Sequence, residues 1–203
     1  MTRERLSIIL LLSSLILTLA VPFIGGSLVQ NYSHFENYIS ELGAVGTQFG
    51  TTISLGGFLP IGLLVICFLI VSKPLVNFTG IAKVGYYFLF FIGLSYIGAA
   101  FAPCDMGCPA EGTVRQSIHN SLGVFEYIGG GIGLLMLATS THYQHGHSRY
   151  KFTLLFSGAI VLIAFIAMAS PELAVWRGLF QRIAEASLFG SLIVVNRTPT
   201  IIR

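Results

Sequence analysis

Charged side chains are scarce in this chain. Asp, Glu, Lys and Arg make up 9% of its 203 residues, against roughly 25% in an ordinary soluble domain. Hydrophobic residues make up 54%, which is more apolar surface than one small water-soluble core can bury. The composition therefore excludes a soluble domain and predicts an integral membrane protein, in which each spanning helix needs about 20 largely apolar residues.

Other absences narrow the function. The sequence has no basic cluster dense enough to bind DNA or RNA, so we expect membrane lipid and no nucleic acid as a partner. It has no internal repeat, and it lacks the His-Glu-x-x-His and Gly-x-Ser-x-Gly motifs of metalloproteases and serine hydrolases. Nothing in the sequence indicates a cofactor.

Six apolar stretches are long enough to cross a membrane. They cover residues 6–28, 51–71, 84–102, 118–139, 152–169 and 173–195. The first exceeds the apolar core of a signal peptide, about 7–15 residues, so we interpret it as an uncleaved helix. The second is expected to end at Ser72-Lys73-Pro74, because proline disfavours helix in the residue before it. Residues 1–203 are therefore expected to form one all-α domain, a polytopic bundle of about six transmembrane helices.

The distribution of basic residues predicts the orientation, because short cytoplasmic loops are enriched in Lys and Arg. Eight basic residues fall on one side of the six stretches and two, Arg115 and Arg177, on the other. The eight are Arg3, Arg5, Lys73, Lys83, Arg149, Lys151, Arg197 and Arg203. We therefore predict that both termini are cytoplasmic and that residues 30–50, 103–117 and 170–172 face outward.

Four segments carry a resemblance to a known family. They are YISELGA (38–44), FAPCDMGCPAEG (101–112), HNSLG (119–123) and GLFQRI (178–183). With them, the chain resembles the prokaryotic membrane family catalogued as domain of unknown function 998. The likeness runs from the first span to the sixth, and Cys-Asp-x-Gly-Cys-Pro followed by His-Asn is its most specific part. The resemblance implies a multi-pass architecture in the inner (plasma) membrane and assigns no substrate or reaction.

The outward segments and the helices that follow them collect groups able to carry chemistry. Glu41 lies in the first segment, Asp105 lies in the second, and His119 and Asn120 open the fourth span. Glu126 follows His119 by seven residues, almost two helical turns, so both side chains should project from one face into the bundle. His119 is then a candidate general base or metal ligand, or a helix-start histidine that hydrogen-bonds to the loop.

The sixth span carries charges inside an apolar stretch. Arg182 and Glu185 are three residues apart and can pair on one helix face. We place Arg182 near the middle of the bilayer, where an unpaired charge costs about 2.5–3.5 kcal/mol or more, and we therefore predict that it pairs with Glu185 or Glu126. Either a functional site or a structural salt bridge would account for such a pair.

Two interpretations are possible for the pair Cys104 and Cys108, and two for a histidine-rich turn. Cys104 and Cys108 flank Gly107 in an outward, oxidising segment, which favours a disulfide. The alternative is zinc held by both thiolates with His119 and a carboxylate. Cys67 is interpreted as a small buried hydrophobe. His142, His145 and His147 are expected to form a solvated turn more than a metal site.

Two classes of function remain open, besides a structural or accessory role. In the first, an outward-facing polar pocket binds a small molecule or lipid. Its expected lining is Glu41, Asp105, His119, Asn120, Glu126, Arg182 and Glu185. In the second, a membrane-embedded hydrolase uses His119, with Asp105 and Glu41 as its carboxylates. The sequence has no established spacing of catalytic residues, which argues against the enzyme. It also has no inverted repeat, which argues against a transporter.

Overall fold

The computed structural model describes residues 1–143 and 147–201. Two residues used in the expectations above, His145 and Arg203, lie outside this part of the chain. Within it, every regular element is a helix, and six helical segments are long and apolar enough to cross a membrane. The predicted all-α architecture of about six spans is therefore confirmed.

The spans are built from nine α-helices and short 3₁₀-helical or π-helical turns. They are α1 (Arg3–Leu28), α2–η2–α3 (Gly50–Ile53, Ser54–Phe58, Leu59–Val76), α4–α5 (Gly80–Phe88, Phe90–Phe101), α6–η3–α7 (Val114–Val124, Phe125–Gly129, Gly130–Leu137), α8 (Ser148–Ala169) and η5–α9 (Pro171–Trp176, Arg177–Ile201). Two short 3₁₀ turns, η1 (Ile39–Gly43) and η4 (Thr141–Tyr143), lie in the connections.

The expected end of the second span is wrong by a few residues. The helix continues through Pro74 to Val76. It ends at Asn77, whose left-handed backbone (φ 49°) is a common way to terminate a helix. Proline lacks only one backbone donor, and near a helix end this loss does not stop the chain from completing the turn.

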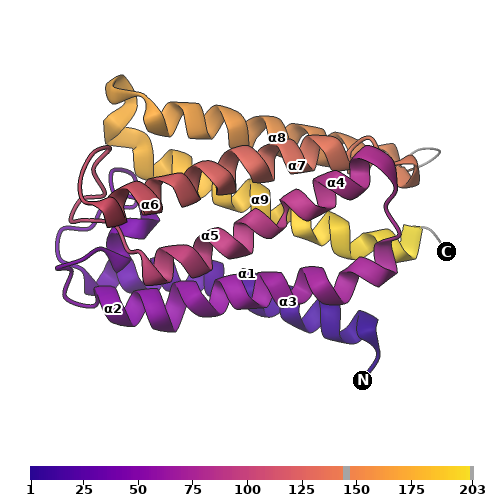
Figure 1. The fold of residues 1–203 in the computed structure, drawn as a ribbon, viewed down its shortest axis with the longest axis horizontal. Helices are drawn as coiled ribbons and strands as arrows, with labels where there is room; N and C mark the ends of the chain where they lie inside the picture. The colour runs from indigo at the N-terminus through magenta and orange to yellow at the C-terminus, as the bar shows by residue number, and fades with distance from the viewer. Residues whose placement is uncertain (144–146, 202–203) are drawn as a thin grey trace.

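Both termini lie at one end of the bundle, and three long connections gather at the other (Figure 1). These connections are residues 29–49, 102–113 and 170–176, and we call this end the loop end. The seven described basic residues predicted to be cytoplasmic lie on the segments that meet at the terminal end. The arrangement agrees with an even number of spans, and the cytoplasmic location of the termini stays a prediction.

Glycines set how closely the helices approach. A Cβ on Gly62 of α3 would lie 2.6 Å from the carbonyl oxygen of Gly93 on α5. A Cβ on Gly85 of α4 would lie 2.6 Å from the carbonyl oxygen of Gly133 on α7. Small residues of this kind are typical of transmembrane interfaces, where close backbone packing replaces the hydrophobic drive of water.

The fourth span contains a π-helical turn, η3, between α6 and α7. Such turns are rare in proteins and are frequent at functional sites. Here the turn contains Glu126 and Tyr127, and both side chains are buried, at 7% and 5% exposure. The local widening of the helix thus brings two neighbouring polar side chains into the interior at the same depth.

Candidate functional site

A cavity of about 470 Å³ lies in the half of the bundle nearer the loop end. Its walls come from α5, α6, η3, α8 and α9, and residues 38–40 and 108–110 of two connections line its upper part. Of the predicted site residues, His119, Asn120, Glu126, Glu185 and Cys108 line the cavity. The connections that cover it also carry Glu41 and Asp105, whose side chains are engaged elsewhere.

Glu185 of α9 is held at the floor of the cavity by two tyrosines. Its Oε1 accepts a hydrogen bond of 2.8 Å from Tyr127, and its Oε2 accepts one of 3.1 Å from Tyr96 on α5. The Tyr127 hydroxyl also accepts from Nε2 of Gln181 at 3.0 Å. Three spans therefore meet in one polar network, although buried polar groups in a membrane are costly unless they are paired.

Glu126 lies beside this network, but one of its oxygens lacks a hydrogen-bond donor among the described residues. Its carboxyl group lies close to that of Glu185. Its Oε1 atom is buried and has no hydrogen-bond partner in the described structure. A buried acceptor without a donor is unfavourable by about 1–3 kcal/mol. Glu126, which lines the cavity, therefore has an unused acceptor beside a second carboxyl group.

Three residues of this network were absent from the sequence-based prediction: Tyr96, Tyr127 and Gln181. Gln181 also accepts from the backbone N–H of Ile39 at 2.5 Å, which ties the network to η1. The available signal was polar side chains within apolar stretches, since Tyr96 lies in the third span and Tyr127 follows Glu126. Their convergence from different spans has no local signature.

The rim of the cavity carries an ion pair that the sequence did not predict. Nη2 of Arg177 lies 3.0 Å from Oε1 of Glu41, and its guanidinium lies 4.7 Å from the centre of the Tyr38 ring. The other oxygen of Glu41 accepts from Nδ2 of Asn37 at 2.8 Å, and Oε1 also accepts from the Tyr38 N–H. Glu41 therefore fastens residues 37–41 to α9.

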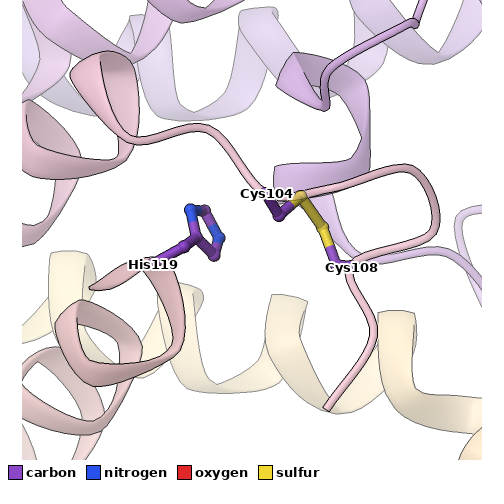
Figure 2. Close-up of side chains that lie close together, drawn as sticks. All are labelled: Cys104, Cys108 and His119. Atoms are coloured by element: carbon purple, nitrogen blue, oxygen red, sulfur yellow. A yellow bond between two sulfur atoms is a disulfide. The ribbon is translucent and has the colours of Figure 1, made fainter. Parts of the chain in front are cut away.

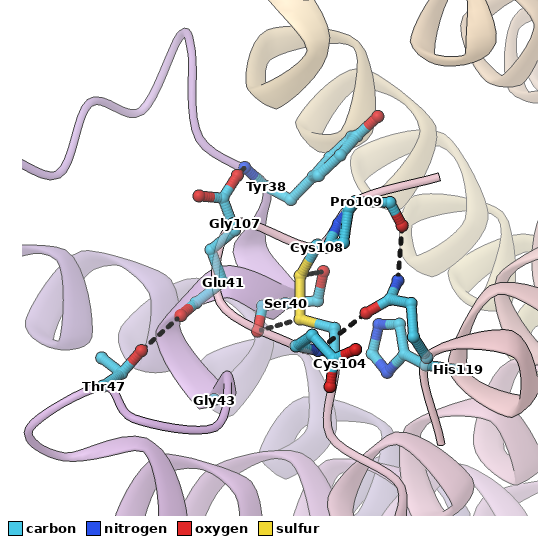
Figure 3. Close-up of a disulfide and its surroundings, with 12 residues drawn as sticks. Tyr38, Ser40, Glu41, Gly43, Thr47, Cys104, Gly107, Cys108, Pro109 and His119 are labelled. Atoms are coloured by element: carbon cyan, nitrogen blue, oxygen red, sulfur yellow. Dashed lines mark hydrogen bonds between the residues drawn. A yellow bond between two sulfur atoms is a disulfide. The ribbon is translucent and has the colours of Figure 1, made fainter. Parts of the chain in front are cut away.

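Cys104 and Cys108 form a disulfide, as predicted. It lies between the two connections that cover the cavity, where the N–H of Val45 donates to the carbonyl of Cys104 at 2.9 Å. Figure 2 shows His119 of α6 beside the bond, and Figure 3 shows the bond between the His119 ring and Ser40 and Glu41 of η1. Cys67, in contrast, is exposed on α3, so its predicted burial is wrong.

His119 and the two sulfur atoms are the one group of potential metal ligands found in the described residues, with ligand atoms within 4.8 Å of one another. The disulfide occupies both sulfurs in this structure. Nδ1 of His119 lies 3.0 Å from the carbonyl oxygen of Ala102. Because a carbonyl only accepts, Nδ1 carries the proton and Nε2 is the free acceptor.

Asp105 does not contact His119. Its carboxylate accepts from the N–H and hydroxyl of Thr113, both at 2.9 Å, and from Arg115 at 3.0 Å. The backbone hydrogen bond from Thr113, together with Arg115, lowers the pKa of Asp105 below its ordinary value. This carboxylate fixes the start of α6 and lies outside the lining of the cavity.

Asn120 lines the cavity but also holds the disulfide segment. Its Nδ2 donates to the carbonyl of Ala110 at 2.9 Å. Its Oδ1 accepts from Gln116 at 2.8 Å. Gln116, which is fully buried, in turn accepts from the N–H of Asp105 at 2.7 Å. The amides of Asn120 and Gln116 thus keep residues 105–110 over the cavity.

The predicted pairing of Arg182 with Glu185 or Glu126 is wrong. Among the described residues no carboxylate lies within 4 Å of its guanidinium, which donates instead to four neutral acceptors. They are the Tyr32 hydroxyl at 2.6 Å, Nδ1 of His34 at 3.0 Å, and the carbonyls of Asn37 and Gly178 at 3.1 and 2.9 Å.

The position of Arg182 along the span explains the error. Pro171–Trp176 is a 3₁₀ helix, and α9 begins only at Arg177. Arg182 is therefore about 8 Å along α9, at 1.5 Å per residue, and its long side chain reaches back to the loop end. Glu185 lies nearly one turn further along α9, and its carboxylate is held on the cavity side by Tyr96 and Tyr127.

Comparison with protein families agrees with this architecture. The family model described as "Protein of unknown function (DUF998)" matches residues 13–197, which is most of the chain. The chain belongs to the DUF998 family. No curated protein and no solved structure matches it. In this DUF998 protein the matched range includes four spans in full, most of the first and sixth, the disulfide and every residue of the polar network.

Proposed function

We propose that this DUF998 protein binds a small amphipathic molecule or lipid in the cavity, with a hydrogen-bond-donating headgroup, best an amine, directed at Glu126. The observation that carries the proposal is the buried Oε1 of Glu126, which has no partner in the described structure and belongs to a residue that lines the cavity. A donor from a ligand would satisfy this atom.

The chemistry of the lining supports a headgroup that is cationic or donates hydrogen bonds. Two carboxyl groups in contact repel each other when both are ionised, so a positive charge or a shared proton between them is favoured. Phe58, Phe165 and Met168 supply apolar walls around them. A cavity with apolar walls and a few convergent polar groups is typical of small-molecule sites.

The hydrolase alternative has less support. The atoms of Glu41 and Asp105 are committed to Arg177, Arg115 and backbone donors, and neither residue lines the cavity. Nε2 of His119 is free, but no described carboxylate hydrogen-bonds to its ring. We therefore favour binding over catalysis. An esterase assay on wild type and on His119→Asn tests the alternative directly.

The test of binding uses three probes of equal chain length: dodecylamine, dodecanol and dodecanoate. A ligand that binds the folded protein raises the midpoint of thermal unfolding. We expect the amine to raise the midpoint most in wild-type protein and to lose this advantage in Glu126→Gln. Equal shifts by amine and alcohol in both proteins would contradict the assignment of Glu126.

A second variant blocks the cavity without touching its carboxyl groups. Gly123 lines the cavity, and a Cβ at this position would meet nothing within 4 Å. Gly123→Leu should therefore fold normally and abolish the response to the probes. Gly56, which also has open space around it and does not line the cavity, provides the matched control Gly56→Leu.

A further inference from the structure

A second hollow lies between α1 and α9 and shares two lining residues, Ile39 and Glu185, with the cavity. It has a volume of about 590 Å³. Its lining is Leu15, Thr18, Leu19, Pro22, Phe23, His34, Ile39, Arg182, Glu185, Ala186, Phe189 and Gly190. We call it the α1–α9 groove. Phe23 and Leu19 are 73% and 74% exposed, so the groove opens on the side of the bundle that faces lipid.

The two basic side chains of the groove lie at the same end of it. Arg182 and His34 lie at the loop end, and the residues that follow along both helices are mostly apolar. Glu185 also borders the groove, but both of its carboxylate oxygens accept from Tyr96 and Tyr127 on the cavity side. The charged group at the head of the groove is therefore the guanidinium of Arg182.

Among the residues that the structure describes, the neighbours of Arg182 do not neutralise its charge. Its four acceptors are a hydroxyl, an imidazole nitrogen and two carbonyls, all formally neutral. The other two arginines of the loop end differ, because Arg177 pairs with Glu41 and Arg115 pairs with Asp105. Close to a membrane interface, an uncompensated guanidinium attracts an anion. A phosphate oxygen can accept from its Nε–H, which none of these four hydrogen bonds uses.

The depth of the groove fits a hydrocarbon chain. Gly190 follows Arg182 by eight residues, which is roughly 12 Å along the helix. A Cβ at Gly190 would meet no atom within 4 Å, so the deep end of the groove is open. Ala186, one turn above, is exposed as well. Small residues on α9 thus leave space along α1 below the guanidinium.

We propose that the α1–α9 groove binds an anionic phospholipid, with its phosphate on Arg182 and one acyl chain along α1 toward Gly190. Charge and shape point to the same occupant, since the cation lies at the head of an apolar channel that opens to lipid. The proposal does not depend on the function proposed for the cavity. It concerns Arg182, which lines the groove and not the cavity, and a ligand of opposite charge.

The test measures retained lipid by native mass spectrometry. Protein in detergent is mixed with equimolar phosphatidylglycerol and phosphatidylcholine of identical chains. We expect wild-type protein to retain phosphatidylglycerol preferentially. In Arg182→Gln this retention should fall roughly tenfold, because a hydrogen bond to a charged group is lost. Arg115→Gln removes a cation that already has a carboxylate partner, so it should bind like wild type.

Gly190→Leu separates lipid binding from the structural role of Arg182. The leucine would fill the groove and leave the hydrogen bonds of Arg182 to Tyr32 and His34 intact. Loss of phosphatidylglycerol in Gly190→Leu, with retention in Gly56→Leu, would support the proposal. Equal retention of the two lipids by wild type, or undiminished phosphatidylglycerol in Gly190→Leu, would overturn it.

Different variants test the two proposals, so one proposal can be contradicted without the other. Gly190→Leu should keep the thermal response to dodecylamine, and Gly123→Leu should keep phosphatidylglycerol. If Arg182→Gln does not fold, Gly190→Leu alone decides the lipid proposal. If free phosphate competes with phosphatidylglycerol but the choice of acyl chain has no effect, the anion site stands without the groove, and the proposal of a bound lipid is overturned.

Discussion

Tyr127 and Glu185 come from different spans and are joined by a hydrogen bond of 2.8 Å deep in the bundle. The tyrosine also accepts from Gln181, so it connects the carboxyl group to the residue that binds the backbone of Ile39. The floor of the cavity and one of the segments that cover it therefore form one hydrogen-bonded unit.

Removal of the Tyr127 hydroxyl should destabilise the protein. Tyr127→Phe leaves Oε1 of Glu185 without its donor and Nε2 of Gln181 without its acceptor. We expect a loss of about 1–3 kcal/mol in the free energy of unfolding, the range for buried polar groups left unpaired. Reversible unfolding in mixed micelles measures it. Tyr150→Phe is the control, because the half-buried Tyr150 loses only an exposed hydrogen bond from Arg149. Equal stability of the two variants would contradict this prediction.

The contact between α4 and α7 should be intolerant of a single methyl group. Gly85→Ala would place its Cβ 2.6 Å from the carbonyl oxygen of Gly133 and 2.7 Å from Cβ of Met136. Overpacking of this kind costs about 1–3 kcal/mol. Gly56→Ala adds the same group in open space and should be neutral. The comparison uses thermal unfolding midpoints, and two indistinguishable variants would argue against close packing at Gly85.

The disulfide should stabilise the cover of the cavity. Replacing both Cys104 and Cys108 by serine should lower stability by about 2 kcal/mol, the loop-closure value for so short a separation. Maleimide labelling of denatured protein, with and without prior reduction, reports the state of the two cysteines. Cys67 should label in both samples. Labelling of all three cysteines without reductant would show that the bond is absent.

Stability should depend on the protonation of His34. Burial, and then the positive charge of Arg182, lower the pKa of His34 below 6.5 in the folded protein. Because the folded pKa is depressed, this contribution is fully present above pH 6.5 and is lost as the pH falls through the folded pKa. His34→Gln should show a weaker decline of the unfolding midpoint between about pH 7 and pH 5. An unchanged pH profile would contradict it.

The orientation of the bundle is a further prediction. The basic residues of the terminal end predict that both termini are cytoplasmic, so that the cavity opens on the outer side. Fusion of an outside-active phosphatase and of a cytoplasm-active fluorescent reporter to the C-terminus should give only fluorescence. Phosphatase activity from the C-terminal fusion would reverse the assignment.

The spans were predictable from sequence, because length and apolarity are local properties of each stretch. The pair Cys104 and Cys108 was predictable for the same reason, since four residues of separation restrict the geometry. The partner of Arg182 was not. The prediction relied on the three-residue spacing between Arg182 and Glu185. It took no account of the length of the arginine side chain or of the loop acceptors Tyr32 and His34, which only the folded chain brings near.

The candidate site was predicted in part. Glu126, Glu185, His119 and Asn120 do border one cavity, because their spans begin or pass at the same end of the bundle. The contact between Glu126 and Glu185 was missed, as were Tyr96, Tyr127 and Gln181. These groups meet through packing among the third, fourth and sixth spans, and the order of packed helices is not encoded in any short segment.

The π-helical turn at Phe125–Gly129 divides the fourth span into two halves whose side chains face different neighbours. Above it, α6 presents His119 and Asn120 to the cavity. Below it, α7 presents Gly133 to α4 and Gly131 to α8. A π-helical turn holds one residue more than an α-helical turn, so deleting one residue within it would restore regular α-helix and keep both halves in phase. A deletion in α6 or α7 would instead rotate the residues beyond it by about 100°. In this span a one-residue deletion should therefore be tolerated better in the turn than on either side of it.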